Sequence, residues 1–215
     1  QLSGGQRQRL AMARALAPSP RVVLLDEPFS SLDVEVRLRL RSELSAVLEA
    51  CEASGVIVTH DPDEALAICD RVAVMRDGVL HQCASPQDIV RTPATPFVGS
   101  FVLQRNVIPA QSIRPDQWSC PLGDLSDQDI RMGATTASED NCCVLVESKD
   151  IEIVADDGGH ASIVGREFLG DLWEYRVRMG ELIIRATCPV ERDYPPHMPC
   201  NLKVKSGAAI DLMAS

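Results

Sequence analysis

The sequence predicts an α/β segment followed by a small all-β segment, and three features of its apolar pattern indicate this order. Two apolar runs, at residues 22–25 and 55–59, are continuous, as expected of parallel strands that are buried on both faces. Apolar residues at helical spacing predict a helix over about residues 34–52, between the two runs. From Cys143 onward, short apolar segments separated by turn residues are typical of a small barrel or sandwich.

Composition excludes several classes of protein. The 215 residues, 45% of them hydrophobic and 24% charged, allow one or two globular domains with a real core, which excludes a chain disordered throughout. No stretch approaches the roughly 18 apolar residues of a membrane-spanning helix, and no secretory signal pattern opens the chain. The net charge of −10 argues against a general nucleic-acid binder, because affinity for the phosphate backbone comes from clustered Lys and Arg.

The eight cysteines are predicted to be free thiols in a reducing compartment. Their share of the chain lies well below that of a disulfide scaffold, and no pair has the C-x-x-C spacing. A zinc site needs grouped ligands, whereas the histidines are scattered along the chain. We therefore expect structural roles for the candidate ligands of the second half, which are His160, His197, Cys188 and Cys200.

Capping signals mark two further helices. Asp61, Pro62 and Glu64 stand at the N-cap, N1 and N3 positions of a predicted helix. Ser85 and Pro86 begin another helix in the same way. These signals are structural and carry no chemistry of their own.

A hairpin and a series of short strands complete the predicted elements. The Asp77-Gly78 pair between apolar runs predicts a hairpin formed by residues 72–75 and 79–81. The later β segments are predicted at residues 144–146, 151–153, 161–164, 174–177, 182–185, 202–204 and 209–212.

The two segments meet near residue 100. Residues 92–105 contain prolines and a glycine and are predicted to be a connection, whereas residues 106–141 lack periodicity and are predicted to be irregular or weakly stranded. We place an α/β domain at residues 1–98 and a β domain at residues 99–215.

The chain opens on a motif suited to binding phosphate. Ser3 can cap the helix that follows, and Gly4 and Gly5 allow the backbone to approach a ligand closely. The free N–H groups and the positive dipole end of a helix favour an anion. A simple capped helix explains the same residues, so this motif alone does not decide between the two interpretations.

Charged residues follow both buried strands. Asp26 and Glu27 end the first strand, where one carboxylate can hold Mg²⁺ through water while the other orients and deprotonates a water nucleophile. His60 ends the second strand, and Asp33 lies shortly after the first. Because ligands of open α/β sheets bind at the carboxyl ends of strands, we expect Asp26, Glu27 and His60 at one edge of the sheet.

Together, residues 2–82 closely resemble the second half of an ABC transporter ATPase domain. Residues 2–6 are similar to its signature motif, and residues 22–27 to Walker B with the catalytic glutamate. Asp33 falls in a segment similar to the D-loop, and His60 matches the switch histidine. The resemblance implies part of a P-loop NTPase core, with ATP and Mg²⁺ as cofactors. It implies catalysis by Glu27 and His60, Mg²⁺ binding by Asp26, and nucleotide binding by Ser3, Gly4, Gly5, Gln6 and Asp33.

Other motifs of that family do not occur in this sequence. The phosphate-binding pattern G-x-x-x-x-G-K-[ST], the Q-loop and the aromatic residue that stacks on adenine are all absent. All three precede the signature motif in the family, and the chain opens at Gln1 without a Met. We expect that an N-terminal part is missing, and that the 215 residues alone have little or no ATPase activity.

The second half resembles the C-terminal domain of importer subunits in this family. Residues 84–89 and 93–98 are similar to the segment that follows the importer ATPase core. Residues 147–151 and 166–171, with Trp173 shortly after, are similar to parts of an OB-like domain of the TOBE type. This match is looser than the first. It is nearest to the ATPase subunits of ferric-iron importers, with sulfate and polyamine importers close behind.

The resemblance implies an ATP-hydrolysing importer subunit at the cytoplasmic face of the inner membrane. Its implied partners are a second ATPase subunit, integral permease subunits and, indirectly, an extracytoplasmic solute-binding protein, with no nucleic acid. One alternative is a soluble ABC ATPase acting in DNA repair or translation, which usually carries a coiled-coil insertion or a second ATPase core. Another is a regulatory or interaction module, against which the intact Glu27 and His60 argue.

Overall fold

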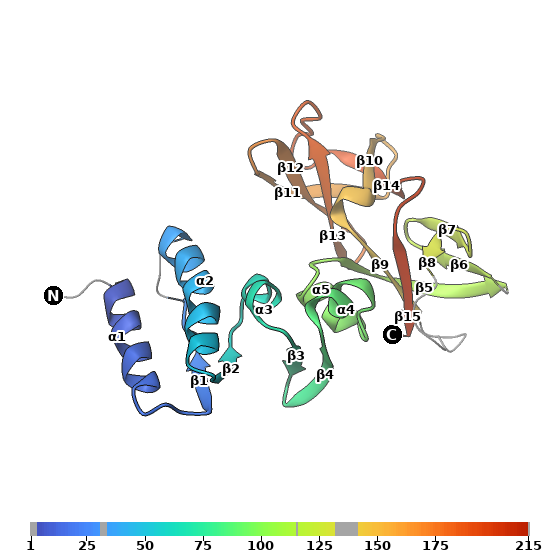
Figure 1. Ribbon diagram of the computed structural model, residues 1–215. Coiled ribbons are helices and arrows are strands. Elements are labelled where there is room, and N and C mark those ends of the chain that lie inside the picture. The colour runs from blue at the N-terminus through green and yellow to red at the C-terminus, as the bar shows by residue number, and fades with distance from the viewer. Residues whose placement is uncertain (1–3, 31–33, 115, 132–141, 215) are drawn as a thin grey trace. The chain divides into compact units, whose positions relative to one another are not determined.

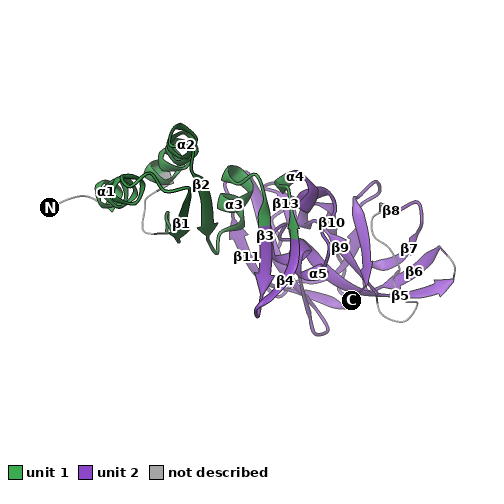
Figure 2. Cartoon of the chain, turned by 60° about the horizontal axis from the view of Figure 1, so that its bottom comes forward, with its two compact units in different colours: residues 1–72, 83–86 green, residues 73–82, 87–215 purple. Residues whose placement is uncertain are grey.

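The computed structural model describes residues 4–30, 34–114, 116–131 and 142–214 (Figure 1). The chain forms two compact units (Figure 2). The first comprises residues 1–72 and 83–86, and the second comprises residues 73–82 and 87–215. Ser3 and Asp33 lie outside the described residues.

The first unit consists of helices packed on a parallel strand pair. Its elements are α1 (Gly4–Leu16), β1 (Val22–Asp26), α2 (Val34–Ala50), β2 (Ser54–Val58) and α3 (Pro62–Ile68). The predicted strands and the predicted helix between them are confirmed. Strands β1 and β2 pair in parallel, with Val22 opposite Ser54 and Asp26 opposite Val58. The core of this unit is formed by Phe29, Leu40 and Leu44, against which Leu25 of β1 and Ile57 of β2 pack.

The prediction that both strands are buried on both faces is wrong for this structure. Leu25 and Ile57 face the helices, but their chain neighbours Leu24 and Val56 are 76% and 50% exposed. Among the described residues, β1 and β2 pair only with each other, and α1 and α2 contribute to the core on one face. A continuous apolar run therefore does not show that a strand is buried on both faces, because here helices cover only one face of the strand pair.

A hairpin and two short helices follow. Strands β3 (Val72–Arg76) and β4 (Val79–Ala84) pair, as predicted, through Asp77 and Gly78, whose φ angles of 51° and 78° are left-handed. Helix α4 (Pro86–Arg91) begins at the predicted position. Within residues 92–105, predicted to be only a connection, the structure forms α5 (Pro96–Phe101), in which the Thr95 side chain accepts a hydrogen bond from the Val98 N–H. Six residues are too few for apolar periodicity to reveal this helix.

Besides the hairpin of β3 and β4, the described residues of the second unit contain two larger, mostly antiparallel sheets. One sheet has the order β7-β6-β5-β9-β15-β8, from β5 (Asn106–Arg114), β6 (Gln117–Cys120), β7 (Gly123–Ser126), β8 (Ile130–Arg131), β9 (Cys142–Val146) and β15 (Ile210–Ala214). The other has the order β10-β14-β11-β12-β13, from β10 (Ile151–Ala155), β11 (Ala161–Phe168), β12 (Leu172–Met179), β13 (Leu182–Pro189) and β14 (Pro199–Val204). A 3₁₀ turn, Ser148–Asp150, separates β9 from β10. All the short strands predicted from residue 144 onward are confirmed.

Of the two alternatives predicted for residues 106–141, the described part is stranded and not irregular. Strand β5 is nine residues long and pairs with both β6 and β9. Its sequence mixes Asn, Pro, Gln and Ser with apolar residues, so the alternation is weak, and the strand is fixed by its neighbours.

Side chains from both sheets share one core, which includes Ile108, Val144, Ile163 and Tyr175. The chain is thus a mixed α/β protein.

Polar side chains tie the start of β5 to both sheets. Asn106 donates from Nδ2 to the Arg185 carbonyl at 2.9 Å and accepts from the Arg185 N–H at 2.8 Å. The buried Arg105 guanidinium pairs with Asp211 of β15 and with Glu147 at 3.4 Å. Lys149 also pairs with Glu147, and this hydrogen bond is the main cause that lowers the pKa of that carboxyl.

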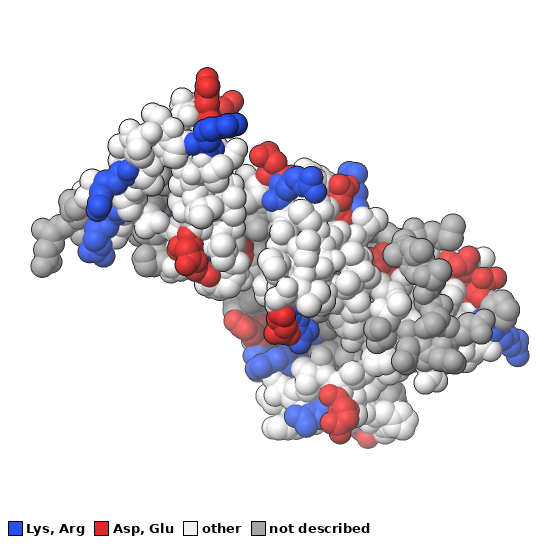
Figure 3. Space-filling view, turned by 90° about the horizontal axis from the view of Figure 1, so that it is seen from below, with Lys and Arg blue, Asp and Glu red and all other residues white. Residues whose placement is uncertain are grey.

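The cysteines form no disulfide and no metal-ligating group among the described residues. All eight cysteines are free, and burial raises the pKa of the Cys143 thiol to about 11. Cys188 and Cys200 are buried, and the described residues contain no group of three metal-ligating side chains. On the face drawn in Figure 3, the basic side chains of the described residues lie interspersed with acidic ones. In the described part of the chain, none of the helices has both the length and the apolar character to span a bilayer.

Candidate functional site

The carboxyl ends of β1 and β2 lie at the same edge of the strand pair because the strands are parallel and in register. Asp26 is the last residue of β1 and stands opposite Val58, the last residue of β2. The Glu27 N–H donates to the Val58 carbonyl at 2.9 Å, which extends the pairing by one residue. His60 follows β2 by two residues. The first unit therefore gathers Asp26, Glu27 and His60 at one edge, as the order of the strands predicts.

Glu27 turns the chain sharply at the end of β1. Its φ of 45° is left-handed, a conformation that costs a non-glycine residue about 1–3 kcal/mol. The Glu27 carbonyl accepts hydrogen bonds from the Ser30 N–H at 3.3 Å and from the Ser30 hydroxyl at 3.1 Å, and both stabilise the turn. The surrounding hydrogen bonds thus hold Glu27 in a strained backbone conformation at the strand end.

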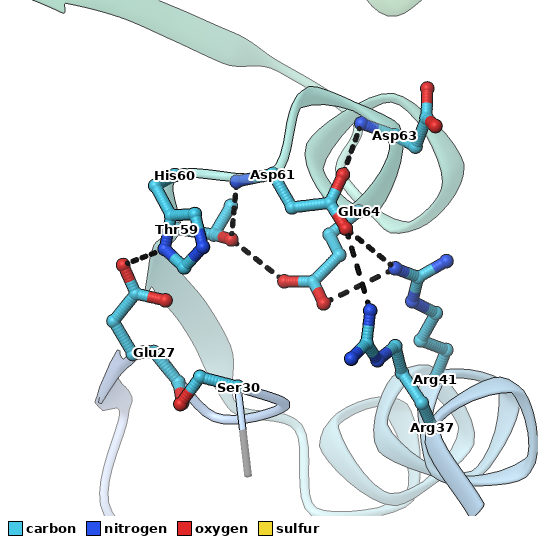
Figure 4. Close-up of polar contacts among 9 residues, drawn as sticks. All are labelled: Glu27, Ser30, Arg37, Arg41, Thr59, His60, Asp61, Asp63 and Glu64. Carbon is cyan, nitrogen blue, oxygen red and sulfur yellow. Dashed lines mark hydrogen bonds and ion pairs between the residues drawn. The ribbon is translucent and has the colours of Figure 1, made fainter. Parts of the chain in front are cut away.

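The Glu27 carboxylate contacts the His60 imidazole. His60 Nδ1 lies 2.7 Å from Glu27 Oε1 (Figure 4). This hydrogen bond, with the negative charge of Glu27, raises the pKa of His60 above its ordinary value of 6.5. The His60 side chain is 76% exposed and that of Glu27 is 35% exposed, so water and a ligand can reach both groups.

Asp26 offers oxygen ligands to a hard cation. Its side chain is exposed, and among the described residues it has no hydrogen bond or ion pair of its own. Mg²⁺ prefers carboxylate oxygens and keeps several of its waters. An exposed carboxylate with no partner among the described residues therefore fits the predicted role of holding Mg²⁺ through water.

A second network lies behind His60, on the turn from β2 to α3. The Thr59 hydroxyl donates to Glu64 Oε2 at 2.7 Å and accepts from the Asp61 N–H at 3.1 Å. Arg41 of α2 lies 3.2 Å from Glu64 Oε1 and 3.5 Å from Asp61 Oδ2, and Arg37 lies 3.8 Å from the same Asp61 oxygen. Figure 4 shows both arginines reaching from α2 toward this turn.

The first turn of α1 lies against the first turn of α2. Helix α1 begins at Gly4, and a Cβ on Gly5 would lie 3.1 Å from Cγ1 of Val36. Further along, Arg9 pairs with Glu43 at 2.8 Å, so the two helices run side by side in the same direction (Figure 1). The lack of a side chain at Gly5 thus allows α1 to pack closely against α2. The next residue, Gln6, is exposed.

Sequence reasoning found some members of this edge and missed others. Asp26, Glu27 and His60 are brought together as expected. Arg41 was not singled out, and Glu64 was assigned only a capping position. Glu64 stands out in the structure because it is only 3% exposed, and the burial of a charged residue cannot be seen in the sequence.

Comparison with known proteins found a matching family model and several similar curated proteins. A family model described as ABC transporter matches residues 1–30. A Fe(3+) ions import ATP-binding protein of Rhizobium etli is 38% identical over 202 residues, which are 91% of this chain and 56% of that protein. A spermidine/putrescine import ATP-binding protein of Pseudomonas aeruginosa is 36% identical over 188 residues, covering 84% of this chain and 50% of that protein.

A third relative is named for a different solute. A sulfate/thiosulfate import ATP-binding protein of Brucella melitensis is 40% identical over 159 residues, covering 74% of this chain and 43% of that protein. The chain spans about half the length of the curated relatives it matches.

Proposed function

The chain belongs to the ABC transporter family of ATP-binding proteins, and we propose that it serves in the ATP-hydrolysing subunit of an importer. The observation that carries this proposal is the contact between Glu27 and His60, 2.7 Å apart and solvent-accessible, at the carboxyl ends of two parallel strands. A carboxylate and an imidazole in contact can share the work of activating a water and holding a phosphate.

The two side chains have different tasks. The Glu27 carboxylate orients the attacking water and accepts its proton. His60 donates from Nδ1 to Glu27, and its raised pKa favours a proton on Nε2 as well. Nε2–H is then free to donate to a γ-phosphate oxygen. Mg²⁺, held through water by Asp26, would offset the negative charge that develops on the transferred phosphoryl group.

The start of α1 contributes to a site shared with a second copy. The N–H groups at Gly4, Gly5 and Gln6, with Ser3 before them, are suited to the γ-phosphate of an ATP molecule bound to the partner subunit. Asp33, after β1, would also lie near the nucleotide. This arrangement makes the working unit a dimer of ATPase subunits, and we take the two subunits to be copies of one protein.

The proposed transport function requires a solute and a membrane permease. Among the solutes in the names of these relatives, we favour ferric iron, because a relative named for it aligns with 91% of this chain. The subunit would act at the cytoplasmic face of the inner membrane on integral permease subunits, supplied by an extracytoplasmic solute-binding protein. Residues 1–98 would form part of the ATPase domain, and residues 99–215 an OB-like domain of the TOBE type.

The test uses the whole gene product, reconstituted with its permease and solute-binding protein in lipid vesicles. The proposal predicts Mg²⁺-dependent ATP hydrolysis that ferric iron stimulates, with uptake of iron into the vesicles. Stimulation by sulfate or spermidine instead would keep the importer assignment and replace the solute. Hydrolysis stimulated by nucleic acid or ribosomes, without uptake, would contradict the assignment as an importer.

A further inference from the structure

His60 is poorly fixed by its own surroundings. Its side chain is 76% exposed, and it forms a hydrogen bond to Glu27. An exposed side chain gains little orientation from packing, so the position of the imidazole depends on the backbone that carries it. The two residues that flank His60 therefore decide where the ring lies.

Both flanking residues are held in place. Thr59 uses its hydroxyl twice, as donor to Glu64 at 2.7 Å and as acceptor from the Asp61 N–H at 3.1 Å. The second bond spans His60 and closes the turn around it. Asp61 is also fixed by capping α3, since its Oδ1 accepts from the Asp63 N–H at 3.0 Å. Glu64 is the residue to which this turn is attached.

Glu64 is in turn attached to α2. Its side chain is 4% exposed, and a buried carboxylate is stable only with a charged or hydrogen-bonding partner. Arg41 supplies the charge at 3.2 Å and Thr59 the hydrogen bond. Arg41 itself is largely buried, with a side-chain exposure of 14%. An ionic network therefore joins α2 to α3 and to the turn that follows β2.

We propose that Thr59 and Glu64, anchored by Arg41, are positioning residues that hold His60 against Glu27. The proposal rests on the proposed function, in that it assigns support to the same site. It also links that site to α2, which begins at Val34, directly after the segment that contains Asp33. A movement of α2 changes the place of Arg41, and through Glu64 and Thr59 it changes the place of His60.

The first experiment compares two variants of Thr59 in the whole protein. Thr59→Ser keeps the hydroxyl, whereas Thr59→Val keeps the shape and removes it. The proposal predicts that the Val variant loses about 10-fold to 100-fold in kcat, the range expected for a small misplacement of a catalytic group, with KM for ATP nearly unchanged. The Ser variant should stay within about 2-fold of wild type, because it rescues the contact.

A second experiment follows His60 without using hydrolysis. NMR titration of the His60 ring reports its pKa, which the hydrogen bond to Glu27 raises. Asp61, Glu64, Arg37 and Arg41 also face this turn, but Thr59→Val changes none of these charges. The Val variant should therefore lower the pKa of His60 toward about 6.5, while the Ser variant leaves it raised. If the whole protein hydrolyses no ATP, the proposed function fails and this titration still tests the positioning.

Matched variants separate positioning from general stability. Glu43→Gln removes the exposed ion pair of α2 with Arg9 and gives the same change in charge as Glu64→Gln. Glu64→Gln should lower kcat, and Glu43→Gln should not. Arg41→Met combined with Glu64→Gln should cost no more in kcat than the more damaging single change, since the residues act as one unit.

Three results would overturn the proposal. The first is a folded Thr59→Val variant with wild-type kcat and an unchanged pKa of His60. The second is equal loss of activity in Thr59→Val and Thr59→Ser together with equal loss of thermal stability, which indicates a structural role alone. The third is an effect of Glu43→Gln as large as that of Glu64→Gln.

Discussion

Replacing Asp211 by Asn should lower the free energy of unfolding of the second unit by about 3 kcal/mol. Asp211 is the main charged partner of Arg105, and the two side chains are 9% and 5% exposed. Removing one partner of a buried ion pair costs about 3–5 kcal/mol, because the other charge is left without compensation. Here the lower end applies, since Glu147 remains 3.4 Å from the Arg105 guanidinium.

Urea denaturation measures this change. Both tryptophans of the chain, Trp118 and Trp173, lie in the second unit, so tryptophan fluorescence reports its unfolding. With a urea dependence of about 1–3 kcal/mol per molar, a loss of about 3 kcal/mol moves the midpoint down by about 1–3 M.

A matched control makes the result decisive. Asp193→Asn is the same chemical change in an exposed ion pair, since Asp193 is 58% exposed and its partner Arg166 is 30% exposed. Exposed pairs contribute about 0.2–1 kcal/mol, so this variant should move the midpoint far less. An Asp211→Asn variant no less stable than Asp193→Asn would refute the account of Arg105 as a buried charge that depends on Asp211.

Two further predictions concern His60. His60→Ala in the whole protein should lower the rate of ATP hydrolysis while the affinity for ATP stays near normal. Nucleotide titration measures the affinity, and steady-state kinetics measure the turnover. Loss of affinity with no separate loss of turnover would favour a structural role. The contact with Glu27 raises the pKa of His60, so its stabilisation is fully present below about pH 6.5 and is lost as the pH rises through the raised pKa. The difference in melting temperature between wild type and His60→Gln should therefore shrink from about pH 6.5 upward, and a difference independent of pH would contradict the pairing.

Local signals in the sequence predicted the elements that carry the site. Continuous apolar runs located β1 and β2, and the Asp61 cap located the start of α3, because both signals depend on residues close in the chain. The order of parallel strands then placed Glu27 and His60 at one edge. Their contact at 2.7 Å depends on the left-handed backbone of Glu27, which could not be predicted from the identity of the residue.

Features that depend on distant partners were not predictable in this way. Strand β5 is fixed by β6 and β9, and the buried Asn106 is satisfied by Arg185, 79 residues further along. The role of Glu64 depends on Arg41, which belongs to another helix. Burial of the strands was not predictable either. Leu24 is apolar but exposed, because the sequence of a strand does not show which of the strand's faces other elements cover.

The most direct test of the central claim is a single-turnover measurement on the whole protein with Glu27→Gln. Glutamine keeps the shape of Glu27 and cannot accept the proton of the attacking water. With saturating ATP and Mg²⁺, hydrolysis should slow by about 10²–10⁴-fold, the usual contribution of a general base, while ATP stays bound and the dimer accumulates. Hydrolysis at the wild-type rate by a Glu27→Gln protein that binds ATP would contradict the assignment of Glu27 as the catalytic base.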